Sequence, residues 1–202
     1  MDSLTFSNTW FRDGAKNIWN NIIPIYSPKK ILEIGSYEGQ ATCYLIEHLG
    51  NLQTIEITCI DTWEGGFEHK EHGTDMSAVE KRFHDNIQFA ASSVLNFPFV
   101  EIRKGTSEIE LMKLFLEGRQ NYYDFIYIDG SHETVDVLSD AVLSFKLLAP
   151  EGLMIFDDYC WASGVKNLDY FPKMAIDAFT TIHANKIEMI PTYNTQIAIV
   201  KT

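Results

Sequence analysis

The chain has 202 residues, and 16 Lys and Arg against 28 Asp and Glu give a formal net charge of −12. A hydrophobic fraction of 46% supplies the core of one domain, which excludes a disordered chain. The acidic balance argues against binding to nucleic-acid backbones or anionic membranes and favours a neutral or cationic small molecule or a divalent metal. We therefore expect neither nucleic acid nor membrane among its partners.

Residues 1–28 stand apart from the pattern that follows. Trp10, Phe11, Ile18 and Trp19 fit a helix, which either packs onto the domain or acts as a lid over a site. We expect an N-terminal helical segment over 1–28 and a single domain over 29–202. The first residues lack the basic and apolar regions of a signal peptide.

Strands and helices alternate from residue 30 onward. The predicted strands are Lys30–Ile34, Glu56–Ile60, Phe99–Arg103, Tyr123–Ile128 and Gly152–Phe156. The predicted helices include Gln40–Leu49, Ser77 to about Ala91, Ser107–Leu116 and Phe171–His183. Ser77 and Glu80 are expected to form a capping box at the start of the second of these helices. A further helix is predicted from its buried face, which carries Val135, Leu138, Val142, Phe145 and Leu148. Lys186–Ile190 and Thr195–Val200 are expected to pair around Pro191–Asn194. The pattern predicts an α/β, Rossmann-like three-layer sandwich with a mostly parallel seven-stranded sheet and a C-terminal antiparallel hairpin.

Polar residues follow every predicted parallel strand. They are the turn Glu33–Gly39, Asp61, Lys104–Ser107, Asp129–His132 and Asp157–Tyr159. In an open parallel sheet, ligands bind beyond the carboxyl ends of the strands. The sequence therefore predicts a ligand site along this edge.

The first turn carries Gly35 and Gly39, which allow a tight turn and close approach of a ligand. Its spacing is not the GxGxxG that suits a pyrophosphate, and the acids Glu33 and Glu38 repel one but tolerate a ribose or a cationic group. Asp61 is placed to accept hydrogen bonds from a ribose diol.

With this turn, Asp61 and the terminal hairpin, the chain resembles class I S-adenosylmethionine-dependent methyltransferases over residues 30–200. The resemblance implies S-adenosylmethionine as cofactor, with the Gly35 turn at its methionine portion, Asp61 at the ribose, and Thr106 and Ser107 beside the adenine. Trp63 either borders the adenine or belongs to the core. The expected cofactor residues are Glu33, Gly35, Ser36, Gly39, Asp61, Thr62, Trp63, Gly105, Thr106, Ser107 and Asp129.

The segments IDGSH (Ile128–His132), LLAPEG (Leu147–Gly152) and DDY (Asp157–Tyr159) resemble metal-dependent O-methyltransferases of the macrocin type and catechol O-methyltransferase. The resemblance implies Asp129, Asp157 and Asp158 as Mg²⁺ ligands. Glu151 and Thr134 depart from that family's pattern.

Physical chemistry agrees with a metal, because three neighbouring carboxylates repel one another and a hard cation with oxygen ligands relieves the repulsion. Such an ion lowers the pKa of a bound hydroxyl. We expect Asp129 and His132 in catalysis, with His132 taking the hydroxyl proton. The alternatives are that His132 caps a helix or bonds an Asp, and that the acids are N-caps in a metal-free enzyme.

The first hypothesis is methyl transfer to a hydroxyl of a small molecule, such as a sugar or a catechol-like ring. The alternatives are a metal-independent N- or O-methyltransferase, a nucleotide-binding dehydrogenase and a non-catalytic domain. The acceptor pocket is expected from residues 1–28, 62–76 and 160–170, where Tyr159 and Trp161 either wall the pocket or join the core.

Other features favour simple interpretations. His69 and His72 lack further zinc ligands at suitable spacing and are assigned to a solvated loop. Cys43, Cys59 and Cys160 are interpreted as reduced thiols of a cytoplasmic protein. The oligomeric state is left open, with a homodimer as one candidate.

Overall fold

The computed structural model describes residues 3–161, 167–192 and 195–202. Its strands are β1 (Lys30–Ile34), β2 (Glu56–Asp61), β3 (Phe99–Lys104), β4 (Tyr123–Ile128), β5 (Leu148–Phe156), β6 (Ile187–Ile190) and β7 (Ile197–Lys201). Its helices are α1 (Trp10–Asp13), α2 (Lys16–Tyr26), α3 (Gln40–Leu49), α4 (Phe67–Glu71), α5 (Met76–Ser92), α6 (Ser107–Leu116), α7 (Thr134–Leu147) and α8 (Pro172–Ile182), with a 3₁₀ turn η1 (Leu168–Tyr170).

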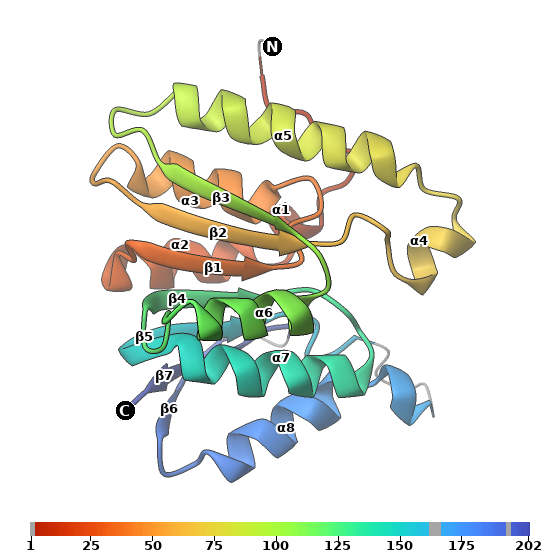
Figure 1. Ribbon diagram of the computed structural model, residues 1–202, viewed down its shortest axis with the longest axis vertical. Helices are drawn as coiled ribbons and strands as arrows, with labels where there is room; N and C mark the ends of the chain where they lie inside the picture. The colour runs from red at the N-terminus through yellow and green to blue at the C-terminus, as the bar shows by residue number, and fades with distance from the viewer. Residues whose placement is uncertain (1–2, 162–166, 193–194) are drawn as a thin grey trace.

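The seven strands form one sheet in the order β3-β2-β1-β4-β5-β7-β6 (Figure 1). Strands β1 to β5 are parallel, whereas β7 runs antiparallel to both β5 and β6. This confirms the predicted mostly parallel sheet with a C-terminal antiparallel hairpin. The strand order reverses between β1 and β4, which is where open α/β sheets bind ligands.

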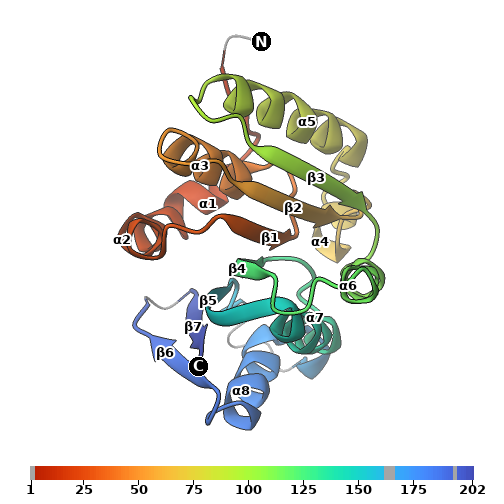
Figure 2. The ribbon, with the colours of Figure 1, turned by 60° about the vertical axis from the view of Figure 1, so that its left-hand side comes forward.

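Helices cover both faces of the sheet, so the molecule has three layers (Figure 2). One core cluster joins the sheet to α2, α3 and α5 around Trp19 and Phe83, and the other joins it to α6, α7 and α8 around Leu114 and Phe179. Because both faces are covered, the central strands are mostly apolar: in β4 every residue except Asp124 is buried.

The N-terminal segment packs against the first of these clusters. Ile18 and Trp19 of α2 are buried, and the Trp19 ring meets Phe125 and Tyr127 edge-on, with ring centroids 5.3 and 4.7 Å apart. Trp10 of α1, in contrast, is 63% exposed. The segment therefore combines a packed helix with a short solvent-facing one.

The predicted buried face of α7 is partly wrong. Val135 and Val142 are 76% and 38% exposed, and Leu148 already belongs to β5. The face that meets the sheet is instead carried by Val137 and Ala141, with Phe145. The apolar spacing of Val135 and Val142 is helical, but it lies on the solvent side of the helix.

The start of α5 also differs from the prediction. Asp75 is its N-cap and accepts hydrogen bonds from the backbone N–H of Ser77 and Ala78. Glu80, predicted to close a capping box with Ser77, instead pairs with Lys104 at 2.7 Å. An Asp two residues earlier satisfies the backbone donors of this first turn.

Other boundaries move by a few residues. Strands β2 and β3 each run one residue further than predicted, β5 begins at Leu148, and β7 begins at Ile197. Glu151, where the resembling family commonly has glycine, adopts φ +63° within β5. The predicted loop 62–76 contains helix α4, which lies beyond the arrowheads of β1 and β2 (Figure 1). Residues 193–194 of the predicted turn lie outside the described chain.

Within the described ranges, no helix is both long and apolar enough to span a membrane. Cys43 and Cys59 are buried free thiols, and Cys160 is exposed.

Candidate active site

The turn after β1 presses against the end of β4. Gly35 has φ +85°, and a Cβ there would lie 1.9 Å from the backbone O of Asp129. Gly39 has φ +80° and packs against Phe83. Both glycines are therefore required by backbone shape, and Gly35 brings the predicted methionine-binding turn directly beside Asp129.

Glu33 lies inside this turn and is 1% exposed. Its carboxylate accepts hydrogen bonds from the Ser36 hydroxyl at 2.7 Å and from the Thr42 hydroxyl. Burial raises the pKa of Glu33, while these hydroxyls oppose the shift. The side chains of Glu33 and Ser36 thus hold the turn together from within.

Glu38, the second acid of the turn, is fully buried and already neutralised. Arg82 of α5 contacts its carboxylate at 2.5 Å, and Ser7 donates both its backbone N–H at 2.6 Å and its hydroxyl at 2.8 Å. The sequence predicts that Glu38 repels a pyrophosphate, and in the structure its charge is paired with that of Arg82. Glu38 ties the N-terminal segment and α5 to the turn.

Asp61, at the end of β2, accepts backbone hydrogen bonds from Tyr37 at 2.8 Å and Trp63 at 2.7 Å, one on each carboxylate oxygen. Burial raises the pKa of Asp61, against the effect of these amides. Trp63 is 4% exposed and packs on Phe83 in the core cluster. The Thr62 hydroxyl accepts from the Glu64 N–H.

The turn after β3 is fixed to Asp61 by its backbone. The Gly105 N–H donates to the Asp61 carbonyl at 3.0 Å, and a Cβ on Gly105 would lie 2.8 Å from a carboxylate oxygen of Glu110. Thr106 is the N-cap residue of α6 without a side-chain cap bond, and Ser107 is its first residue. The predicted ribose and adenine residues therefore lie side by side.

Two carboxylates at the ends of β4 and β5 share one phenol. The Tyr127 hydroxyl contacts Asp129 at 3.0 Å and also contacts Asp157. Burial raises the pKa of Asp129 and of Asp157. Repulsion from Asp157 and Asp158 raises the pKa of Asp129 further, and repulsion from Asp158 raises that of Asp157. Among the described residues, a phenol and an amide hold this pair in place.

Gln196 and Trp19 extend this cluster and were not found from the sequence. Gln196, 1% exposed just before the last strand, donates to Asp157 at 2.8 Å and accepts from the Trp19 indole N–H at 3.2 Å. A lone Gln and a Trp among core residues carry no sequence signal for this role. Tyr127 is missed for the same reason, because an apolar strand normally buries its aromatic residues.

Asp158 faces a different partner. Its carboxylate lies 2.8 Å from His132 Nε2, and its backbone has φ +57°, an uncommon value for a residue other than glycine. The His132 ring lies 4.4 Å from the Trp161 ring. His132 therefore bonds an Asp, as one of its two predicted alternatives stated.

The predicted metal ligands meet at one place, but they are engaged by protein groups. No cluster of three or more His, Cys, Asp or Glu in the described part of the chain has an arrangement that could hold a metal. Asp129, Asp157 and Asp158, with His132, line a depression of about 10 Å³. The oxygen donors themselves are of the kind that a hard cation prefers: they are three carboxylates, and the pKa values of Asp129 and Asp157 are raised.

Three aromatic rings meet beside the turn after β1, which contains Tyr37. Trp10, Tyr37 and His69 come from three segments, with ring centroids 5.2 to 6.1 Å apart. His69 belongs to α4 and accepts from the Gly66 N–H, in place of the solvated loop predicted for it. Of the expected acceptor segment 160–170, residues 162–166 lie outside the described chain.

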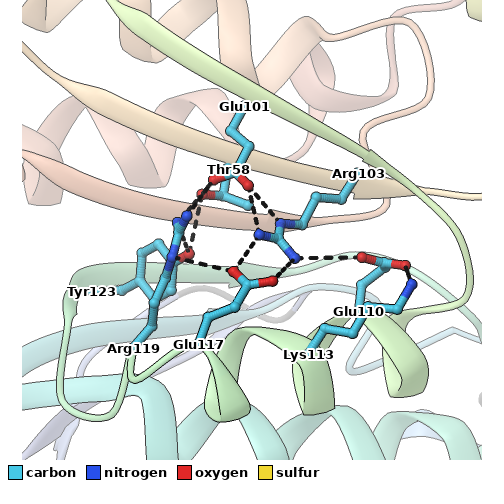
Figure 3. Close-up of polar contacts among 8 residues, drawn as sticks. All are labelled: Thr58, Glu101, Arg103, Glu110, Lys113, Glu117, Arg119 and Tyr123. Atoms are coloured by element: carbon cyan, nitrogen blue, oxygen red, sulfur yellow. Dashed lines mark hydrogen bonds and ion pairs between the residues drawn. The ribbon is translucent and has the colours of Figure 1, made fainter.

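A second charged cluster connects β3 to helix α6 and to the turn that follows α6 (Figure 3). Arg103 contacts Glu101 at 2.6 Å and Glu117 at 2.5 Å, and Arg119 contacts Glu101 at 2.7 Å. Lys113 contacts Glu110 at 2.7 Å. Every carboxylate in this network faces a cation.

Comparison with known proteins gives a family and a fold. Residues 32–159 match the family described as methyltransferase domain. The structure resembles an O-methyltransferase from Bacillus cereus solved with S-adenosylhomocysteine, at 20% identity over 98% of this chain and 83% of that chain, with a TM-score of 0.66. It also resembles the O-methyltransferase TomG from Streptomyces achromogenes, involved in tomaymycin synthesis and solved with S-adenosylmethionine, at 14% identity over 100% and 83% of the chains, with a TM-score of 0.64.

A curated relative is the uncharacterized protein R132 of Acanthamoeba polyphaga mimivirus, 23% identical over 135 residues. The match covers 63% of this chain and 50% of that protein, so the chain spans about half the length of this relative.

Proposed function

The chain belongs to the methyltransferase domain family, and from this premise we propose that it is an S-adenosylmethionine-dependent enzyme that methylates a hydroxyl oxygen of a small molecule. In that reaction the acceptor oxygen bonds the methyl carbon as the carbon–sulfur bond breaks. The hydroxyl proton passes to a base, and S-adenosylhomocysteine is the product.

The observation that carries the proposal is the contact between the Gly35 turn and Asp129. Gly35 at the proposed methionine site touches the backbone of Asp129, the first residue of the acid cluster. A methyl donor on the turn is thereby brought beside groups that bind and deprotonate a hydroxyl, as an in-line transfer needs.

The cofactor would extend along three strand ends. The backbone of the Gly35–Gly39 turn would hold the methionine portion, Asp61 the ribose, and Gly105 to Ser107 the adenine. Each Asp61 oxygen already accepts one backbone N–H, and a carboxylate oxygen accepts a second bond, so the ribose hydroxyls need no rearrangement of these amides.

The residues that would hold a divalent cation such as Mg²⁺ are Asp129, Asp157 and Asp158, whose oxygen donors suit it, and their carboxylates would have to shift from the described arrangement to surround one ion. When bound it would lower the pKa of an acceptor hydroxyl. The chain's own part is to hold the carboxylates: Tyr127 and Gln196 fix Asp157, and Tyr127 fixes Asp129. The raised pKa values of Asp129 and Asp157 support this proposal, because a cation would relieve the repulsion behind them.

The contact of His132 with Asp158 favours a second route without metal. His132 would take the hydroxyl proton, and Asp158, 2.8 Å from its ring, would stabilise the imidazolium. The two routes make different use of Asp158, which would bind the ion in the first and stabilise the charged His132 in the second. Removing each partner separately therefore distinguishes them.

We assign a neutral or cationic hydroxylated acceptor, a sugar or a catechol-like ring, because the chain is acidic and aromatic rings such as Trp161 and Trp10 lie near the site. The depression between the acids, about 10 Å³, also has the His132 side chain in its lining.

The experiment is methyl transfer from labelled S-adenosylmethionine to a panel of hydroxylated sugars, catechols and amines, with Mg²⁺ or with EDTA. Transfer to a hydroxyl that Mg²⁺ stimulates and Asp158→Asn abolishes supports the metal route. EDTA-resistant transfer that His132→Ala abolishes supports the His132 route. Transfer to amines alone contradicts hydroxyl methylation.

A further inference from the structure

One face of the molecule has the pattern of a buried surface but is exposed. On α7, Val135 and Val142 are seven residues apart and 76% and 38% exposed. Ser139, partly exposed, lies between them. Two turns of helix thus present an apolar stripe away from the sheet, while Val137 and Ala141 face the core.

The neighbouring helix continues the stripe. On α6, Ile109, Met112 and Leu116 recur at intervals of three and four and are 46%, 39% and 83% exposed. Helices α6 and α7 pack side by side on one layer, with α8 on the far side of α7 (Figures 1 and 2). We call these five residues the α6–α7 face: Ile109, Met112, Leu116, Val135 and Val142.

The exposed charges on α7 lie at its two ends, and Asp140 in its middle is buried. Asp136 lies in the first turn and Lys146 in the last, both exposed. Neither side chain forms an ion pair with another residue of the described chain. The helix is therefore complementary in charge to a copy of itself that runs the opposite way.

We infer that the α6–α7 face is the contact surface for a second copy of this chain, related by a two-fold axis near the middle of α7. In an isologous interface each patch meets its own copy. Antiparallel α7 helices then bring Asp136 of one copy to Lys146 of the other, twice. Ser139, a small residue beside the axis, lets the helices approach closely.

This arrangement explains the apolar pattern of α7 better than a monomer does. Val135 and Val142 lie where water would surround them in a single chain, and burying them against a second copy removes that contact. The face runs along α6 and α7 from first turns that follow directly on the strand ends, whereas Leu116 and Val142 lie further along these helices.

The test is the mass of the purified full chain by light scattering during size-exclusion chromatography, over a range of concentrations. We expect twice the mass of one chain. Val142→Glu should raise the dimer dissociation constant about a hundredfold, because a two-fold axis counts each added charge twice. The matched control is Leu95→Glu in the loop before β3, where Leu95 is 84% exposed; it should leave the mass unchanged.

A charge exchange tests the orientation of the two copies. Asp136→Lys should weaken the dimer about tenfold, since the introduced lysine would meet Lys146 of the second copy. The double variant Asp136→Lys with Lys146→Asp should restore it, because the pair is re-formed with opposite sign. Melting temperature and far-ultraviolet circular dichroism verify that each variant is folded.

A monomer at every concentration overturns the inference, as does a dimer unaffected by Val142→Glu. A dimer that dissociates with Leu95→Glu but not with Val142→Glu places the interface at the β3 edge and also overturns it. A dimer broken by Val142→Glu but not restored by the charge exchange refutes the antiparallel arrangement.

Discussion

Two clusters of charged residues in this molecule are built in opposite ways. At the ends of β4 and β5, Asp129 and Asp157 share the phenol of Tyr127, and burial with repulsion from neighbouring acids raises the pKa of both. Under α6, Arg103 lies between Glu101 and Glu117, and this cation lowers the pKa of Glu117 (Figure 3). Among the described residues, Asp129 and Asp157 form no ion pair with a Lys or Arg, whereas the acids under α6 are paired with Arg103 and its neighbours.

The difference separates a structural network from a binding site. Charges that are paired within the chain gain little from a ligand, whereas clustered acids are stabilised by any cation or proton that enters. The unpaired cluster also lies at the carboxyl ends of the strands, where ligands bind in this architecture. Variants that remove one cluster and spare the other therefore test this division.

The largest effect is expected from Asp157→Ala. Removing this carboxylate, which Tyr127 and Gln196 position, should lower Mg²⁺-stimulated methyl transfer at least about a hundredfold. Affinity for S-adenosylhomocysteine should change less than about threefold, because the cofactor residues lie on other strand ends. If activity and cofactor affinity fall together, Asp157 holds structure and not an acceptor or a metal.

Asp61→Ala tests the cofactor half of the site. The dissociation constant for S-adenosylhomocysteine, measured by calorimetry, should rise about tenfold to a hundredfold, because the ribose loses charged acceptors worth roughly 1.5 to 3 kcal/mol. Asp61→Asn keeps one acceptor oxygen, so its dissociation constant should lie between those of the wild type and Asp61→Ala. An unchanged dissociation constant removes the ribose assignment.

Arg103→Met breaks the paired cluster. It leaves Glu101 and Glu117 without this cation and should lower the free energy of unfolding by about 1 to 2 kcal/mol, less than a fully buried pair because Glu117 is 44% exposed. Denaturant titration measures it. At a temperature where the variant is folded, its cofactor affinity should be unchanged. A large loss of affinity would mean that the paired cluster also contributes to cofactor binding.

The smallest effect concerns an isolated acid on α7. Asp140 is 1% exposed and has no ion pair within the described residues, and burial raises its pKa to about 7, with the Ser107 hydroxyl opposing and Asp136 and Glu108 adding to the shift. Because the folded-state pKa exceeds the unfolded one, the native protein loses stability as pH rises from about 4 through 7.

Asp140→Asn should therefore stabilise the protein by about 1 kcal/mol at pH 8 and by less at pH 5. Thermal unfolding at the two pH values is the measurement. Equal shifts at both pH values would mean that the carboxyl does not titrate across this range.

The sequence predicted the sheet well because its signals are local. β1 and β4 begin and end where predicted, since buried parallel strands are apolar runs bounded by polar residues. The outward face of α7 was misassigned because helical spacing shows that Val135 and Val142 align, but not which side meets the sheet. Helix α4 was missed because five polar-rich residues carry little periodicity.

The same limit applies to the site. Asp61, Asp129 and Asp157 were found because strand ends are recognisable positions. Gln196 was not, because its role depends on where β7 lies beside β5, a pairing between distant segments. The partner of Glu38 was missed for the same reason: Arg82 reaches it from α5, 44 residues away.

The most direct test titrates S-adenosylhomocysteine, with and without Mg²⁺, into the wild type, Asp157→Ala and Arg103→Met in a calorimeter. We predict cofactor binding by all three proteins, and a separate Mg²⁺ heat, abolished by EDTA, that only Asp157→Ala lacks. Absence of cofactor binding by the wild type would contradict the site assignment at the strand ends. Loss of cofactor binding in Arg103→Met to the same extent as loss of Mg²⁺ heat in Asp157→Ala would contradict the division between the two clusters.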